Sequence, residues 1–186
     1  MILVADCGDS FVNNLSALLS SLGAEVLTVP EDSVTEGQVA SADAVILSPG
    51  PGHPHPDRGS WRIYDMCQND IPTLGVCLGH QTICAYHGAD IVRGKGPMHG
   101  KLVRIHHDGT SIFKGVPNDF EAVRYNSLCA DRSTLSLNID AVDSRGDVMA
   151  VSVPGRRVFG VQFHPESFLT EHGTTIIENF LREVGL

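Results

Sequence analysis

A cysteine stands where an apolar, extended segment passes into a helical pattern, in the pentapeptide Gly75-Val76-Cys77-Leu78-Gly79. A nucleophile between small residues at a strand-to-helix junction is typical of a nucleophile elbow, a strained turn above the C-terminal edge of a parallel sheet. The helix N-terminus favours a thiolate, because its partial positive charge stabilises an anion. The pentapeptide therefore predicts a cysteine nucleophile. A buried apolar cysteine between two packing glycines is the alternative.

The second candidate group is His164-Pro165-Glu166, which ends the predicted strand Val158–Phe163. A histidine at a strand end can take a proton from a thiol, and a carboxylate two residues later can hold the imidazole in the required tautomer. Pro165 fixes the backbone between them at a φ of about −65°. Alone, this tripeptide is also typical of a turn. Together with an elbow cysteine it predicts a triad of Cys77, His164 and Glu166.

A third motif, Pro49-Gly50-Pro51-Gly52, follows the apolar run Ala44–Leu47. Glycines allow backbone N–H groups to point at a ligand, as an oxyanion hole requires. The N–H groups of Gly52 and of Leu78, the residue after the cysteine, would form such a pair. A rigid turn without a binding role is the alternative for this loop.

The scaffold must bring these strand ends to one edge of a sheet. Continuous apolar runs separated by helical patterns predict a parallel sheet that is covered on both faces. Such runs lie at Ile2–Ala5, Glu25–Val29, Ala44–Leu47 and Thr73–Val76, with helices expected near 11–22, 58–68, 79–87 and 170–183. Between Ile91 and Val161 the strands are shorter and joined by turns, which predicts antiparallel structure. We expect one domain over residues 1–186, an α/β fold of three α/β/α layers with a mainly parallel central sheet and an added antiparallel β portion.

Composition limits what this scaffold can do. The 22 acidic residues against 13 Lys and Arg give a net charge of −9, which disfavours binding to nucleic acid or to anionic lipid surfaces. No apolar run approaches the roughly 20 residues that span a bilayer, and the N-terminus lacks the basic region of a signal peptide. The 5 cysteines include no Cys-x-x-Cys pair. We therefore expect a cytoplasmic protein without a metal site.

In combination, the motifs resemble those of class I glutamine amidotransferases. The segments Ser48–Gly52, Gly75–Gln81 and His164–Ser167 have the order and spacing of that family. Further segments are similar to the amidotransferase subunits (component II) of anthranilate synthase and aminodeoxychorismate synthase: Asp9–Phe11 with Asn14-Leu15, Met98–Lys101, and Arg124-Tyr125 with Ser127-Leu128. The resemblance covers the whole chain and implies the flavodoxin-like fold of that family.

The resemblance also implies a role for individual residues. Cys77 would attack the side-chain amide of L-glutamine to give a γ-glutamyl thioester, while His164 would transfer protons and Glu166 would orient it. Ammonia would pass along a protected path to a chorismate-binding synthase, component I. The residues implied to hold glutamine are Gly50, Pro51, Gly52, Gln81, Ser127 and Leu128. Those implied at the partner interface are His99, Gly100 and Lys101. No cofactor is expected in this chain, and Mg²⁺ is expected on the partner.

Two positions depart from the family pattern. Asn126 stands where the family usually has a histidine before Ser-Leu, which affects contacts near glutamine or the partner. The N-terminal motif lacks its usual tyrosine and reads Asp6-Cys7-Gly8-Asp9, which affects an interface. Two alternative functions stay open. One is a stand-alone cysteine-dependent γ-glutamyl hydrolase on the same fold. The other is a non-catalytic regulatory protein, against which the intact triad argues.

Overall fold

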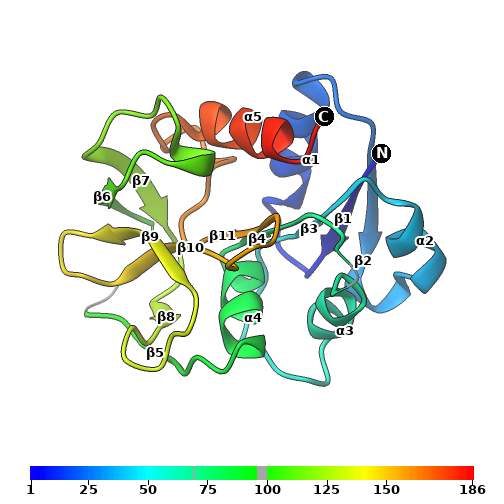
Figure 1. Ribbon diagram of the computed structural model, residues 1–186, viewed down its shortest axis with the longest axis horizontal. Helices are drawn as coiled ribbons and strands as arrows, with labels where there is room; N and C mark the ends of the chain where they lie inside the picture. Colours follow the sequence, from blue (N-terminus) through cyan, green and yellow to red (C-terminus); the bar gives the residue numbers. More distant parts are fainter. Residues whose placement is uncertain (69, 96–99) are drawn as a thin grey trace.

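The computed structural model describes residues 1–68, 70–95 and 100–186. Its strands are β1 (Ile2–Asp6), β2 (Val26–Pro30), β3 (Ala44–Leu47), β4 (Thr73–Val76), β5 (Ile91–Arg93), β6 (Lys101–His107), β7 (Phe120–Arg124), β8 (Leu128–Ala130), β9 (Asn138–Asp143), β10 (Val148–Ser152) and β11 (Val158–Val161). The helices are α1 (Val12–Ser21), α2 (Glu36–Ser41), α3 (Gly59–Met66), α4 (Leu78–Tyr86) and α5 (Gly173–Glu183), with short 3₁₀ turns at Glu31–Ser33 and Ser111–Phe113. Figure 1 shows their arrangement.

Within these residues, one 9-stranded sheet runs in the order β2-β1-β3-β4-β11-β10-β9-β6-β7. The strands β2, β1, β3, β4 and β11 are parallel to their neighbours in this half of the sheet. All residues of β3, β4 and β11 are buried, as expected for strands covered on both faces. The parallel α/β core predicted from the apolar runs is therefore confirmed, and its strand order is that of flavodoxin-like folds.

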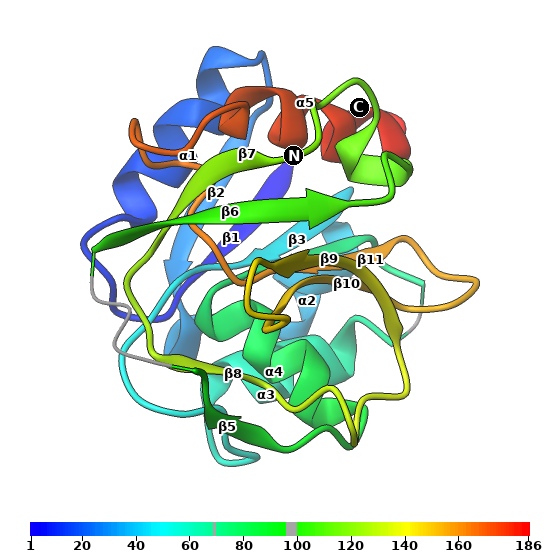
Figure 2. The ribbon, with the colours of Figure 1, turned by 90° about the vertical axis from the view of Figure 1, so that its left-hand side faces the viewer.

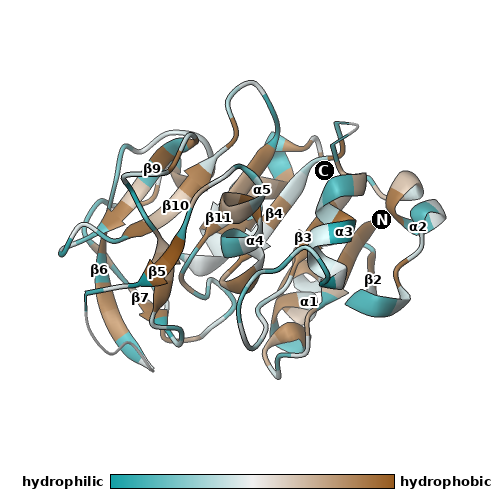
Figure 3. Ribbon diagram, turned by 90° about the horizontal axis from the view of Figure 1, so that it is seen from below, coloured by the Kyte–Doolittle hydropathy of each residue, from teal (hydrophilic) through white to brown (hydrophobic). Residues whose placement is uncertain are grey.

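Alternate side chains of a strand point to opposite sides, so a continuous apolar strand makes both faces of the sheet apolar. Helices cover both of these faces. Ile2 and Val4 of β1 pack in one apolar cluster with α1 and α5, whereas Leu3 and Ala5 pack in the other with α3 and α4. Figure 2 shows these two helical layers on either side of the strands. In Figure 3, apolar residues follow the strands between them. Complete burial of one aliphatic side chain contributes about 1.5–3 kcal/mol.

The second half of the chain extends the sheet with antiparallel strands. β10, β9, β6 and β7 each run antiparallel to their neighbours, and β5 pairs with β8 in a separate two-stranded sheet. This confirms the antiparallel portion with one exception, because β11 lies parallel to β4. β11 is the boundary strand, because it runs antiparallel to β10 and parallel to β4, and only the pairing with β4 departs from the prediction. The last helix also begins later than expected, at Gly173 instead of near residue 170.

The outer edge of β7 is covered by the segment 164–171. The backbone N–H of His164 donates to the Val123 carbonyl at 3.1 Å, and the Val123 N–H donates to the Thr170 hydroxyl at 3.1 Å. The Glu171 N–H donates to the Glu121 carbonyl at 2.9 Å. The Thr170 hydroxyl is thus part of the contact with β7, and Thr170 precedes helix α5, which begins at Gly173.

The parallel register brings the predicted motifs to one edge. Leu47 pairs with Gly75 and Val76 pairs with Val161, so the segments after β3, β4 and β11 leave the sheet at the same level. That edge is the usual position of ligand sites in open α/β sheets. No helix within the described ranges is long and apolar enough to cross a membrane.

Candidate active site

Cys77 occupies the turn between β4 and α4. Its backbone has φ 53° and ψ −99°, a strained conformation for a residue with a side chain, and its N–H donates to the Val161 carbonyl at 2.8 Å. The flanking glycines permit the turn. A Cβ on Gly79 would lie 2.3 Å from the Leu47 carbonyl oxygen, and one on Gly75 would lie 2.4 Å from the Gly79 carbonyl carbon. Side chains at these two positions are therefore excluded by backbone atoms.

His164 and Glu166 form a buried pair after β11. His164 Nδ1 lies 2.6 Å from Glu166 Oε1, and both side chains are almost fully buried. The Thr170 hydroxyl donates to the His164 carbonyl at 2.7 Å, which fixes the backbone of the histidine. Within the described part of the chain, His164 Nε2 has no hydrogen-bond partner of its own, and the ring interacts with Cys77. The three residues of the predicted triad are thus brought together.

The surroundings of His164 favour its protonated form. Burial lowers the pKa of the ring, but the interactions with the Cys77 thiol and with the Glu166 carboxylate outweigh burial and raise the pKa to about 10. A protonated imidazole therefore faces Cys77 at neutral pH.

Two aromatic side chains pack against the His164 ring. Tyr125 meets it edge-on with ring centroids 4.8 Å apart, and Phe11 does so at 5.6 Å. Phe11 and Tyr125 are stacked on each other at 4.9 Å. A Cβ on Gly100 would lie 3.8 Å from Tyr125, so the start of β6 is next to this pair. The arrangement limits the orientations that the imidazole can adopt.

The loop 49–52 lies against the elbow. A Cβ on Gly50 would come within 2.7 Å of the Leu78 side chain and of the Cys7 carbonyl oxygen, so only glycine fits there. The buried Ser48 hydroxyl accepts from the Cys7 N–H at 2.9 Å and donates to the Pro49 carbonyl at 2.8 Å. Gly52 has φ +86°, a conformation that glycine adopts without strain. The structure therefore places the loop beside Leu78.

Two of the residues expected to hold glutamine, Gln81 and Leu128, contact each other. The buried Gln81 amide donates to the Leu128 carbonyl at 3.2 Å and to the Gln162 side chain at 3.1 Å. The Ser127 carbonyl accepts from the Gly94 N–H at 2.8 Å. Gln81 Oε1 is a buried acceptor for which the described residues offer no partner, so it is free to accept from a ligand.

Asn126, the departure from the family pattern, has a local role. Its side-chain oxygen accepts from the Leu128 N–H at 2.8 Å and closes a turn over Ser127. The backbone that was expected to bind glutamine is thus held by the residue that replaces the usual histidine.

A buried ionic cluster beneath this turn was missed by the sequence analysis. Arg124 is fully buried, with Nη1 3.2 Å from Asp147 and 3.8 Å from Asp143, and Nη2 donates to the Leu128 carbonyl at 3.2 Å. The Lys95 N–H also donates to Asp147, at 3.2 Å. The partners are far apart in sequence, and the only signal is an arginine inside an otherwise buried strand.

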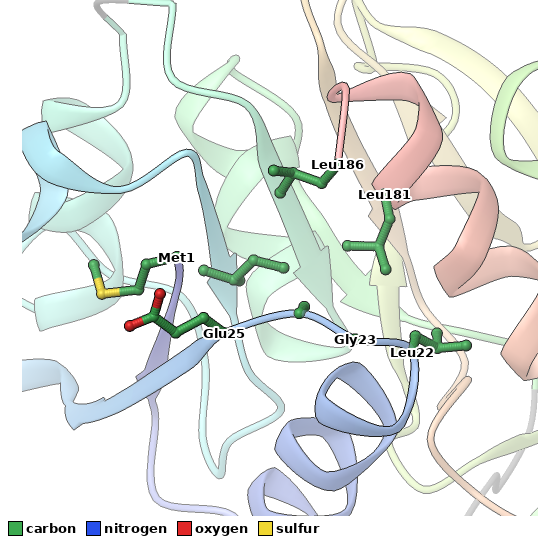
Figure 4. A pocket seen from close by; sticks show the side chains of 8 residues that line it. Met1, Leu22, Gly23, Glu25, Leu181 and Leu186 are labelled. Atoms are coloured by element: carbon green, nitrogen blue, oxygen red, sulfur yellow. The ribbon is translucent and has the colours of Figure 1, made fainter.

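The residues expected at the partner interface lie only partly within the described ranges. His99 lies outside the described residues, whereas Gly100 and Lys101 precede and begin β6. The described ranges contain no group of three side chains that could ligate a metal. Figure 4 shows a cavity of about 210 Å³ lined by Met1, Gly23, Leu181 and Leu186 among others. This cavity lies where β1 begins, at the opposite edge of the sheet from Cys77.

A cysteine on a strained strand-to-helix turn next to a buried His–Glu pair is the arrangement expected of an α/β enzyme that uses a cysteine nucleophile. The chain matches the family Glutamine amidotransferase class-I over residues 3–184. It belongs to this family, and it is a glutamine amidotransferase. The resemblance seen in the sequence is thereby confirmed, while the roles of the individual residues stay predictions.

Curated relatives and a solved structure agree with this family. The chain is 41% identical to anthranilate synthase component 2 of Azospirillum brasilense, covering 97% of this chain and 95% of that protein. It is 40% identical to aminodeoxychorismate/anthranilate synthase component 2 of Bacillus subtilis, again over 97% and 95%. The crystal structure of a protein from Thermoplasma acidophilum that is named as a GMP synthase subunit superposes with a TM-score of 0.86 at 25% identity, over 98% and 92% of the two chains.

Proposed function

We propose that Cys77, His164 and Glu166 hydrolyse L-glutamine and that the ammonia is passed to a chorismate-using synthase. The observation that carries this proposal is the cysteine on a strained elbow next to a buried His–Glu pair. The Cys77 thiolate attacks the side-chain amide carbon, and the tetrahedral oxyanion is stabilised by the N–H groups of Gly52 and Leu78. His164 gives its proton to the leaving nitrogen, so that ammonia departs and a γ-glutamyl thioester forms.

A water molecule completes the reaction. The neutral His164 takes a proton from water, the hydroxide attacks the thioester, and glutamate leaves as the thiolate and imidazolium are restored. Glu166 holds Nδ1 throughout and stabilises the positive ring. The raised pKa of His164 keeps the ring protonated at neutral pH, so that it can donate a proton to the leaving nitrogen.

For the glutamine itself, we propose a pocket between the loop 50–52 and the turn 127–128. Gln81 Oε1, a buried acceptor, suits the substrate α-ammonium group. The backbone of Ser127 and Leu128 would contact the α-carboxylate and α-ammonium groups. Arg124 supports this arrangement because it holds the Leu128 carbonyl from below.

The proposed ammonia acceptor is the component I partner of an anthranilate or aminodeoxychorismate synthase. The names of the two curated relatives support this choice. The partner would dock on His99, Gly100 and Lys101, of which Gly100 lies next to the aromatic pair on His164. Phe168 is 95% exposed only two residues after Glu166, and an apolar partner surface would bury it. We place the complex in the cytoplasm, with Mg²⁺ on the partner and no cofactor in this chain.

The test is to purify the complex with its synthase partner and to compare glutamine-dependent with ammonia-dependent synthesis. Cys77→Ala should abolish the first and leave the second unchanged, while the matched change of another buried cysteine, Cys67→Ala, should alter neither. Loss of both activities in an assembled Cys77→Ala complex would contradict the proposal. Full turnover without a partner would favour the stand-alone hydrolase. No adduct on Cys77 after exposure to a glutamine-like diazoketone would favour the non-catalytic regulatory protein.

A further inference from the structure

Arg58 belongs to none of the sequence motifs of the active site, yet it contacts the loop 49–52. Its Nη1 donates to the Pro51 carbonyl at 2.9 Å, and its Nη2 donates to the Cys7 carbonyl at 3.4 Å. The same Nη2 pairs with Glu31 Oε1 at 2.7 Å. One guanidinium therefore links the segments that follow β1, β2 and β3.

Glu31 fixes the guanidinium in place. It begins the turn after β2, and its second oxygen accepts from the Ser60 N–H at 2.6 Å in the first turn of α3. The Glu31 side chain is 12% exposed and that of Arg58 is 24% exposed. Charge-assisted hydrogen bonds with both carboxylate oxygens engaged are stronger and more directional than neutral ones. The arginine therefore has little freedom to turn away from the loop.

The contact with Pro51 has a geometric consequence. The Pro51 carbonyl and the Gly52 N–H belong to the same planar trans peptide, and in such a unit the C=O and N–H bonds point in opposite directions. Arg58 draws the carbonyl to its side, so the Gly52 N–H must point to the other. A Cβ on Gly52 would lie 3.4 Å from Arg58 Nη1, which shows how closely the guanidinium lies against this residue.

We propose that Arg58, held by Glu31, is a positioning residue that orients the 51–52 peptide and so directs the Gly52 N–H at the oxyanion. This inference rests on the proposed function, in which Gly52 supplies one of the two oxyanion donors. Glycine at position 52 permits more than one orientation of this peptide, because no side chain restricts its φ. Without the arginine, the peptide would sample orientations in which the N–H is turned away from the proposed oxyanion position.

The expected signature is a loss of turnover without a loss of binding. An oxyanion exists only after attack, so its donors affect kcat more than KM. Removal of an oxyanion donor costs roughly 10²–10³-fold in kcat, and a donor that is misdirected part of the time should cost about 10–100-fold. Alkylation of Cys77 by iodoacetamide forms no oxyanion, so its rate should be unaffected.

The experiment uses the complex with the synthase partner and measures three quantities: kcat, KM for glutamine, and the rate of Cys77 alkylation by iodoacetamide, followed by peptide mass. Arg58→Ala should lower kcat by about 10–100-fold and change the other two by less than about twofold. The neutral variant Glu31→Gln should give the same pattern with a smaller loss. Arg62→Ala is the matched control. Arg62 lies in α3, which begins directly after Arg58, and its removal takes away a charge and a hydrogen bond to the Glu31 carbonyl, but no contact with the loop 49–52 is recorded for it.

Two results with Arg58→Ala would speak against the positioning role. Unchanged kcat in Arg58→Ala, or a parallel fall of kcat and alkylation rate, would overturn the positioning role. If Arg58→Ala does not fold, Glu31→Gln decides by the same criteria. A wild-type complex that does not hydrolyse glutamine would instead refute the proposed function.

Discussion

Replacement of Glu166 by glutamine tests how much the buried carboxylate contributes to the reaction. The change keeps the shape of the side chain and an oxygen that can accept from His164 Nδ1, but it removes the negative charge 2.6 Å from the ring. At an effective dielectric of about 20, two charges about 4 Å apart attract by roughly 4 kcal/mol. The imidazolium loses that attraction when the carboxylate becomes an amide.

Part of this energy is retained in the variant, because the amide oxygen still orients the ring. We expect about 3 kcal/mol to be lost from the charged form of His164. The ring gains its charge during the second half-reaction, when neutral His164 takes a proton from water, so at about 1.4 kcal/mol per factor of ten this step, and kcat with it, should fall by roughly 10²-fold. The pKa of His164 should also move down from about 10, since Glu166 is one of the groups that raise it.

The assay is glutamine hydrolysis by the complex as a function of pH, with ammonia-dependent synthesis as the internal control for assembly. Glu171→Gln is the matched variant, because it makes the same chemical change in the same segment at an exposed position and should leave kcat unchanged. A Glu166→Gln enzyme with kcat within about threefold of wild type would show that the carboxylate does not stabilise the imidazolium in the reaction.

Three further predictions concern stability and binding. The folded pKa of His164 lies above its ordinary value of 6.5, so its contribution to the free energy of unfolding is complete below about pH 6.5 and is lost as pH rises towards 10, by at most about 1.4 kcal/mol per unit. Urea titrations across this range should show the decline in wild type, and His164→Gln should lack it. Arg124→Met should cost about 3 kcal/mol in urea unfolding, because the buried Asp147 loses the guanidinium and Asp143 is left with its ion pair to Arg145. The exposed Arg104→Met should cost under about 1 kcal/mol, and equal losses would contradict the argument. Asn126→Ala removes a hydrogen bond worth about 1 kcal/mol from the glutamine-binding turn and should raise KM for glutamine about fivefold, which steady-state kinetics would reveal; an unchanged KM would show that the turn is held without it.

The parts of the site that were predictable are those written in short local patterns. Cys77 lies between glycines at a strand end, and His164 and Glu166 are two residues apart, so a few neighbouring residues are enough to suggest their chemistry. The parallel core was predictable for a similar reason, because its buried strands are continuous apolar runs. A local pattern does not show in which direction a strand runs relative to its neighbour, however. The sequence therefore grouped β11 with the antiparallel part, although it pairs in parallel with β4.

The parts that were not predictable depend on contacts between distant residues. Glu31 and Arg58 are 27 positions apart, and Arg124 and Asp147 are 23 positions apart, so nothing near either arginine identifies its partner. The role of Asn126 was missed for a different reason. The sequence shows that a histidine is replaced, but only the structure shows that the amide oxygen closes the turn at Leu128.

The segment that carries His164 also closes the open edge of the sheet. Without it, β7 would present unpaired N–H and C=O groups at residues 121 and 123, which is the kind of edge that recruits strands from other chains. Damage to this segment should therefore have two effects at once, loss of the proton-transfer group and exposure of an aggregation-prone edge. Variants that loosen it should disappear from the soluble fraction of a cell as well as from the assay. For this enzyme, inactivation and misassembly are expected to have a common cause.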